Sequence, residues 1–89
     1  MTKQERSELY DSLYYGHDAE LKIADQHYFI EWSPIGIDVY AITENIGTKV
    51  TAIPMSEKSE MLSKLFEYKF GEKTDLNTSY ADIKIVDIE

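Results

Sequence analysis

The segment that decides the fold lies between residues 18 and 42 and reads DAELKIADQHYFIEWSPIGIDVYAI. Apolar and polar residues alternate along it, and a period of two is typical of β-strands. Two interruptions divide the segment: the turn residues 24–26, and Ser33-Pro34, because proline cannot donate to a strand ladder. The pattern therefore predicts strands at about 18–23, 27–32 and 35–43. In the third strand one face is predicted to carry Ile35, Ile37, Val39 and Ala41.

One amphipathic helix is predicted before these strands in the sequence, and a second one after them. Residues 3–15 follow Thr2 and include Glu5, a capping box in which each side chain satisfies a free backbone N–H of the first turn. Residues 57–68 follow Ser56, which is predicted to be the N-cap of the second helix. The predicted apolar stripes are Leu9, Tyr10, Leu13 and Tyr14 in the first helix, and Met61, Leu62, Leu65 and Phe66 in the second.

The remaining segments complete an α+β pattern. A weaker fourth strand is predicted at Lys49–Ile53, a loop at residues 71–80 and a last strand at residues 81–88. The order αββββαβ predicts an antiparallel sheet of four to five strands with two helices, in a single domain over residues 1–89. The pattern leaves open whether residues 48–53 pair as a strand and which sheet face the first helix covers.

Composition excludes several classes of function. The chain has 17 acidic and 9 basic residues, a net charge of −8, and no cysteine. This balance excludes a basic surface for phosphates, and the missing thiols exclude a disulfide scaffold, thiolate zinc sites and a cysteine nucleophile. The polar start lacks the apolar stretch of a secretory signal, and no segment approaches the ~18 apolar residues of a membrane span. We expect a cytoplasmic protein with no direct contact to nucleic acid or membrane.

The run Leu13–Ile23, followed by Gln26–Glu31, resembles a group of short proteins of unknown function from low-GC Gram-positive bacteria and their mobile elements. The group has a Gly-His-x-x-Glu-x strand and a Ser-x-x-Leu helix, matched here from Gly16 and from Ser59. Phe66–Thr74 is similar to the group's segment before its closing strand. The resemblance covers most of the chain and implies the same fold but no activity. The chain departs from the group at Ala19 and at Ala24-Asp25-Gln26, where the group has a larger residue and a Gly-Lys hairpin.

No constellation of residues predicts catalysis. The chain has neither a Gly-x-Ser-x-Gly elbow nor a glycine-rich phosphate loop. The only histidines, His17 and His27, lie near Asp18, Glu20 and Asp25 in the sequence, and a hairpin is predicted to place the two histidines across from each other. A zinc or manganese site needs three or four converging ligands, and this set is incomplete. We therefore expect no metal, no cofactor and no enzymatic activity.

One sheet face is a candidate for binding another protein. If Tyr28, Ile30 and Trp32 of the second strand face the core, then His27, Phe29 and Glu31 face the other way, and the third strand adds Tyr40 on that side. Aromatic side chains ringed by acids suit a protein–protein contact if the face is uncovered. The alternative is that the first helix covers this face as a second small core.

The second candidate surface is acidic. Glu5, Glu8 and Asp11 lie three residues apart on the first helix and could attract a basic partner; the alternative is a solvated face that keeps the protein soluble. We predict a small acidic interaction domain that binds another protein, or a second copy of itself through a strand edge or the Phe29/Tyr40 face. The alternative function is a mobile-element inhibitor or immunity-type protein that blocks a basic nuclease or nucleic-acid-binding surface.

Overall fold

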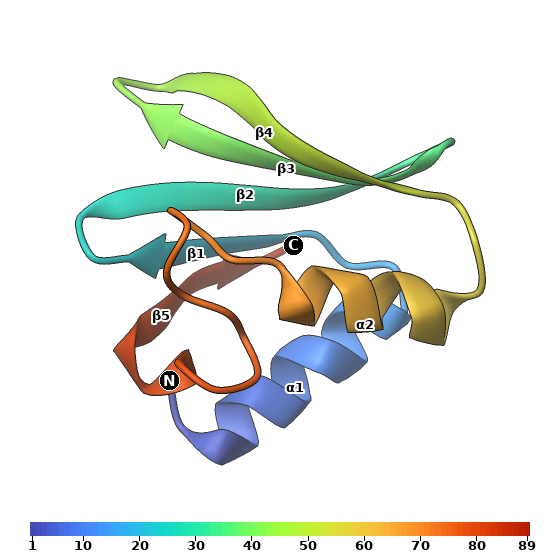
Figure 1. Ribbon diagram of the computed structural model, residues 1–89, viewed down its shortest axis with the longest axis horizontal. Helices are drawn as coiled ribbons and strands as arrows, with labels where there is room; N and C mark the ends of the chain where they lie inside the picture. The colour runs from blue at the N-terminus through green and yellow to red at the C-terminus, as the bar shows by residue number, and fades with distance from the viewer.

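The computed structural model describes all residues, 1–89, and confirms the α+β prediction (Figure 1). The five strands form one antiparallel sheet in the order β4-β3-β2-β1-β5. Neither helix has the length and run of apolar residues needed to cross a membrane. In chain order the elements are α1 (Lys3–Tyr14), β1 (Ala19–Ile23), β2 (Gln26–Ser33), β3 (Gly36–Thr43), β4 (Ile46–Pro54), α2 (Lys58–Glu67), a short 3₁₀ helix (Tyr80–Asp82) and β5 (Ile83–Ile88).

The first four strands are joined by three two-residue turns, which set the register of the sheet. At Ala24, Glu44 and Asn45 the backbone has positive φ, the conformation that tight hairpin turns require. Because the turn between β3 and β4 has only two residues, pairing already begins at Thr43 and Ile46, and β4 is longer than the predicted strand. Residues 48–53 therefore do form a strand.

The prediction that Ile35 belongs to the third strand, on the same face as Ile37, is wrong. Ser33 pairs with Gly36, so Ile35 lies in the turn between β2 and β3, where it is 74% exposed. The Ser33 hydroxyl donates to the Gly36 carbonyl at 3.3 Å and accepts from the Ile35 N–H at 3.3 Å. These two hydrogen bonds close the turn around Ile35, so β3 begins one residue later than the alternation of apolar residues predicts.

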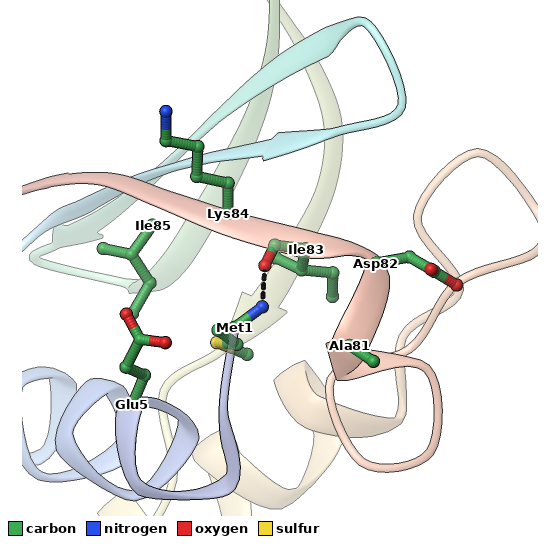
Figure 2. A pocket seen from close by; sticks show the side chains of 7 residues that line it. All are labelled: Met1, Glu5, Ala81, Asp82, Ile83, Lys84 and Ile85. Carbon is green, nitrogen blue, oxygen red and sulfur yellow. Dashed lines mark hydrogen bonds between the residues drawn. The ribbon is translucent and has the colours of Figure 1, made fainter.

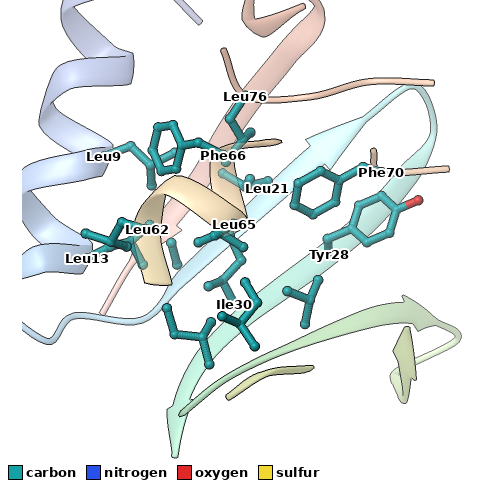
Figure 3. Packing of buried hydrophobic residues seen from close by; sticks show 14 of the residues in the cluster. Leu9, Leu13, Leu21, Tyr28, Ile30, Leu62, Leu65, Phe66, Phe70 and Leu76 are labelled. Carbon is teal, nitrogen blue, oxygen red and sulfur yellow. The ribbon is translucent and has the colours of Figure 1, made fainter. Parts of the chain in front are cut away.

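Both helices pack on the same face of the sheet. The buried apolar residues form one cluster of 17, to which α1 contributes Leu9 and Leu13 and α2 contributes Met61, Leu62, Leu65 and Phe66 (Figure 3). Trp32 of β2 also ties α1 to the sheet, because its indole N–H donates to the Leu13 carbonyl at 3.0 Å. The first helix therefore does not cover the Phe29/Tyr40 face.

The prediction that Ser56 caps the second helix is also wrong. The carbonyl of Glu57 accepts the first intrahelical bond, from the Met61 N–H at 2.9 Å, and Glu57 is therefore the N-cap. Ser56 lies one residue too early for its hydroxyl to reach the free amides of the first turn, and its buried Oγ has no hydrogen-bond partner.

Asp75 organises the loop between α2 and β5. Its carboxylate, only 4% exposed as a residue, accepts hydrogen bonds from the Lys69 ammonium, from the Asn77 N–H at 2.9 Å, and from the Thr78 N–H at 2.6 Å and hydroxyl at 2.9 Å. These bonds, that of Lys69 foremost, hold the pKa of Asp75 well below its ordinary value of 3.8.

Folding stability should therefore fall in acid in a way that depends on Asp75. A carboxyl whose pKa is lower in the folded chain stabilises the fold fully above its unfolded pKa, 3.8, and loses that contribution as the pH falls towards the folded value. We expect Asp75→Asn to lower the melting temperature at pH 7 and to flatten its decline below about pH 4. Melting curves between pH 7 and pH 2 test this, with Asp25→Asn in an exposed turn as the control. An unchanged acid decline in Asp75→Asn would contradict the assignment.

Candidate functional site

The face of the sheet turned away from both helices carries the predicted partner-binding residues of β2 and β3. None of its side chains belongs to the core cluster, and Phe29, Tyr40 and Ile42 are half-buried by their strand neighbours alone. We call this surface the open sheet face. It consists of Glu20 and Lys22 (β1), His27, Phe29 and Glu31 (β2), Asp38, Tyr40 and Ile42 (β3), Lys49 (β4), and Lys84 and Asp87 (β5).

The strand register arranges these side chains in three rows across the sheet. In the middle row Phe29 lies directly opposite Tyr40, so the two aromatic residues predicted to share this face are cross-strand neighbours. The row is flanked by Glu20 on the β1 side and Lys49 on the β4 side. Its centre is therefore apolar and its margins are charged, which is the distribution expected of a protein contact.

The two outer rows carry opposite charges. Glu31 lies opposite Asp38 in one of them, and Lys22 lies opposite both His27 and Lys84 in the other. Asp38 is screened within the chain, because Lys49 Nζ lies 3.5 Å from its Oδ1 and shields a carboxylate whose residue is only 6% exposed. The face thus has an acidic end and a basic end on either side of its aromatic centre.

The histidines do not come together. His27 Nδ1 lies 2.7 Å from Glu20 Oε2, whereas His17 Nδ1 lies 3.2 Å from the Glu89 carbonyl. His27 pairs with Lys22 at the far end of β1, so the prediction that the two histidines face each other across the hairpin is wrong. No group of three or more His, Asp or Glu side chains in the structure could hold a metal ion.

The acidic residues of α1 form a separate surface. Glu5, Glu8 and Asp11 are exposed on the helical layer, on the other side of the sheet from the open sheet face. Glu5 is engaged in the predicted capping box, in which the hydrogen bonds from Thr2 hold its pKa below the ordinary value. Glu8 accepts from the Gln4 amide at 3.1 Å. The cluster is therefore only partly free to meet a basic partner.

Sequence reasoning missed a group of exposed apolar side chains at the end of α1, in the β2–β3 turn and directly after β4. We call it the end patch: Tyr14, Tyr15, Ile35 and Met55. The rings of Tyr14 and Tyr15 lie 5.5 Å apart, and the Met55 N–H donates to the Ile35 carbonyl at 2.9 Å. The sequence contains one indication of this exposure: Ile35 and Met55 are large apolar residues that directly follow prolines, and proline interrupts a strand.

Two depressions in the surface lie near candidate residues. One, of about 410 Å³, lies between Glu5 and β5, where the Met1 amine donates to the Ile83 carbonyl (Figure 2). The other, of about 490 Å³, lies at the basic end of the open sheet face and is lined by Glu20, His27, Ile42, Glu44 and Asn45. The second extends the open sheet face towards the β3–β4 turn.

Comparison of the chain with protein-family models, with curated proteins and with solved structures finds no match. Of the predicted site residues, the fold brings His27, Phe29, Glu31 and Tyr40 together on one face and leaves the three acids of α1 apart from them.

Proposed function

We propose that the chain is a small acidic interaction domain that binds another protein through the open sheet face and performs no catalysis. The observation that carries this proposal is the Phe29/Tyr40 pair on a sheet face that no helix covers. Aromatic side chains are enriched where proteins meet, because they bury a large area with few rotatable bonds. We further propose that the domain is cytoplasmic, and its lack of cysteine is compatible with a reducing compartment.

The surroundings of the aromatic pair also fit a contact. Lys49 Nζ lies 5.9 Å from the Tyr40 ring centroid, and its stem covers part of the sheet between Tyr40 and Asp38. A partner that lies on Phe29 and Tyr40 would exclude water from their remaining exposed area, at roughly 25 cal/mol per Å² of apolar surface. The charged residues at the margin would then determine which partners bind and in which orientation.

Affinity capture with matched variants tests the proposal. A tagged chain is expected to retain a protein partner from a lysate of its native host, and Tyr40→Glu is expected to reduce recovery at least tenfold, as for a central aromatic contact. Tyr40→Glu is expected to leave the sheet intact, because Lys49 lies directly across from position 40 and can pair with the new carboxylate. The control is Ile35→Ser in the end patch, which should retain the partner. Loss with Ile35→Ser but not with Tyr40→Glu would move the site to the end patch and overturn the proposal.

The second candidate function, an inhibitor or immunity-type protein of a mobile element, relies on α1 instead. It is supported by the net charge of −8 and by the outward position of Glu8 and Asp11. In the same capture experiment it requires a basic partner that is lost with Glu8→Lys and Asp11→Lys, kept with Tyr40→Glu, and released as salt screens the charges.

A further inference from the structure

Three charged side chains at the two ends of the open sheet face have no ion-pair partner within the chain. Glu31 at the acidic end, and Lys22 and Lys84 at the basic end, take part in none of its ion pairs. Glu31 is half-buried on β2, and Lys22 is half-buried on β1. These side chains therefore project from the sheet without any neutralising neighbour.

The sheet also places like charges directly across from each other at both ends. Glu31 pairs in register with Asp38, and Lys22 pairs with Lys84. Like charges at such positions destabilise an isolated sheet. Asp38 is relieved by Lys49, but Glu31, Lys22 and Lys84 are not. A surface on which like charges lie unscreened across from each other is expected to contact another molecule.

The two ends are symmetric about the aromatic row. Along β2, Glu31 is two residues on one side of Phe29 and His27, which pairs with Lys22, is two residues on the other. Each end is thus about 7 Å from the aromatic row, at ~3.4 Å per residue. A two-fold axis across the strands at Phe29 and Tyr40 therefore places the acidic end of one copy over the basic end of another.

We infer that the open sheet face binds a second copy of this chain in a two-fold, face-to-face dimer. The inference rests on the proposed function and names the partner of that surface. Phe29 and Tyr40 pack against their own counterparts at the axis, and Glu31 of each copy faces His27 and Lys22 of the other. Glu20, Lys49 and Asp87 lie in the same row and also meet their own counterparts; Glu20 and Lys49 are already paired within the chain, with His27 and Asp38, which leaves only Asp87 at the β5 margin facing an unpaired like charge. Two sheets pack about 10 Å apart, a gap that interdigitating aromatic and long charged side chains fill.

Local charge permits this association although the whole chain is strongly acidic. The open sheet face carries three lysines and four carboxylates, and hence a formal charge of −1, whereas the chain as a whole carries −8. Edge-to-edge pairing through β4 is less suited. Its ladder with β3 shifts register between Val39 and Tyr40, and Lys49 projects from it, and both bulges and edge lysines oppose the addition of a strand.

Charge reversal at the two ends tests the inference. The variants are Glu31→Lys, Lys22→Glu and the double variant, and sedimentation is measured from about 10 μM to 1 mM, where weak dimers form. Each single reversal replaces two attractions across the axis by two repulsions, and we expect it to weaken dimerisation roughly tenfold or more. The double variant exchanges the charges, so it should dimerise like the wild type.

Mixing the single variants gives the sharpest result. An equimolar mixture of Glu31→Lys and Lys22→Glu should form a heterodimer, because both contacts across the axis are then attractive, while neither variant forms its own dimer. Misfolding cannot imitate this pattern. Glu31→Lys places a lysine across from Asp38, and Lys22→Glu places a glutamate across from Lys84. Both changes create opposite charges across the strands, so the melting temperature of the monomer should stay the same or rise.

A wild-type chain that stays monomeric at 1 mM, single variants that still dimerise, or a mixture that stays monomeric would each overturn the inference. The proposed function is judged separately. A monomer that captures another protein in a Tyr40-dependent way overturns the dimer and leaves the proposed function standing. A monomer with no Tyr40-dependent capture overturns both.

Discussion

Gly36→Ala is expected to lower the free energy of unfolding by about 3–5 kcal/mol. Gly36 begins β3 with φ +143°, a conformation that residues with a side chain rarely adopt. A Cβ at this position would lie 1.9 Å from the carbonyl oxygen of Ile53. That oxygen belongs to the backbone of β4, so the strand itself would have to move.

The loss is large relative to the stability of the whole domain. A chain of this length is expected to have a free energy of unfolding of about 4–13 kcal/mol, so the variant should lose between about a quarter and all of its stability. Urea unfolding followed by the fluorescence of Trp32 measures the loss. The matched control is Gly47→Ala in β4, where an added Cβ would approach Tyr40 no closer than 3.7 Å and the expected change is within about 0.5 kcal/mol. Equal losses in the two variants would contradict the close-approach argument.

Leu13→Ala is expected to destabilise the fold by about 2–5 kcal/mol and to release α1 from the sheet. Leu13 is fully buried, and only Leu9 shares that role on α1. An isolated helix of 12 residues is marginal in water, so α1 depends on this packing to stay helical. The Trp32 indole also donates to the Leu13 carbonyl, so release of the helix should change its fluorescence.

Circular dichroism at 222 nm and Trp32 fluorescence, recorded against urea, test this expectation. Ser7→Ala is the control on the same helix, because Ser7 is exposed and alanine favours a helix. We expect the control to unfold at the wild-type urea concentration and Leu13→Ala to unfold at a lower one. A Leu13→Ala variant that retains wild-type stability would show that α1 does not depend on this contact.

Much of the fold was predictable because its signals are local. The alternation in residues 18–42 predicted β1, β2 and most of β3, and Thr2 with Glu5 predicted the start of α1. The errors came where a boundary depended on a single residue. Ile35 continues the alternating pattern, but the Ser33 hydroxyl closes the turn around it. Ser56 has the right side chain for a cap but lies one residue too far from the helix.

The candidate site was predictable only in part. Alternation alone places Phe29 with His27 and Glu31 on one side of β2, and the pattern of β3 indicates the same side for Tyr40. Their rows, and hence the acidic and basic ends, depend on the register between strands, which turn geometry sets. The end patch needed the tertiary structure, because its four residues come from three separate segments.

By itself, the sequence determined the type and order of the elements and which residues share a side of each strand, because periods of 2 and 3.6 are properties of the local chain. Only the tertiary structure decided which side of the sheet became the core. Strand β2 carries apolar residues on both sides, Tyr28 and Ile30 on one and Phe29 on the other, so the local pattern allowed either. The choice followed from the joint burial of both helices' apolar stripes in one cluster, with Trp32 bonded to α1. That burial combines apolar residues from segments far apart in the sequence, so the local pattern does not predict it, and it leaves Phe29 and Tyr40 uncovered.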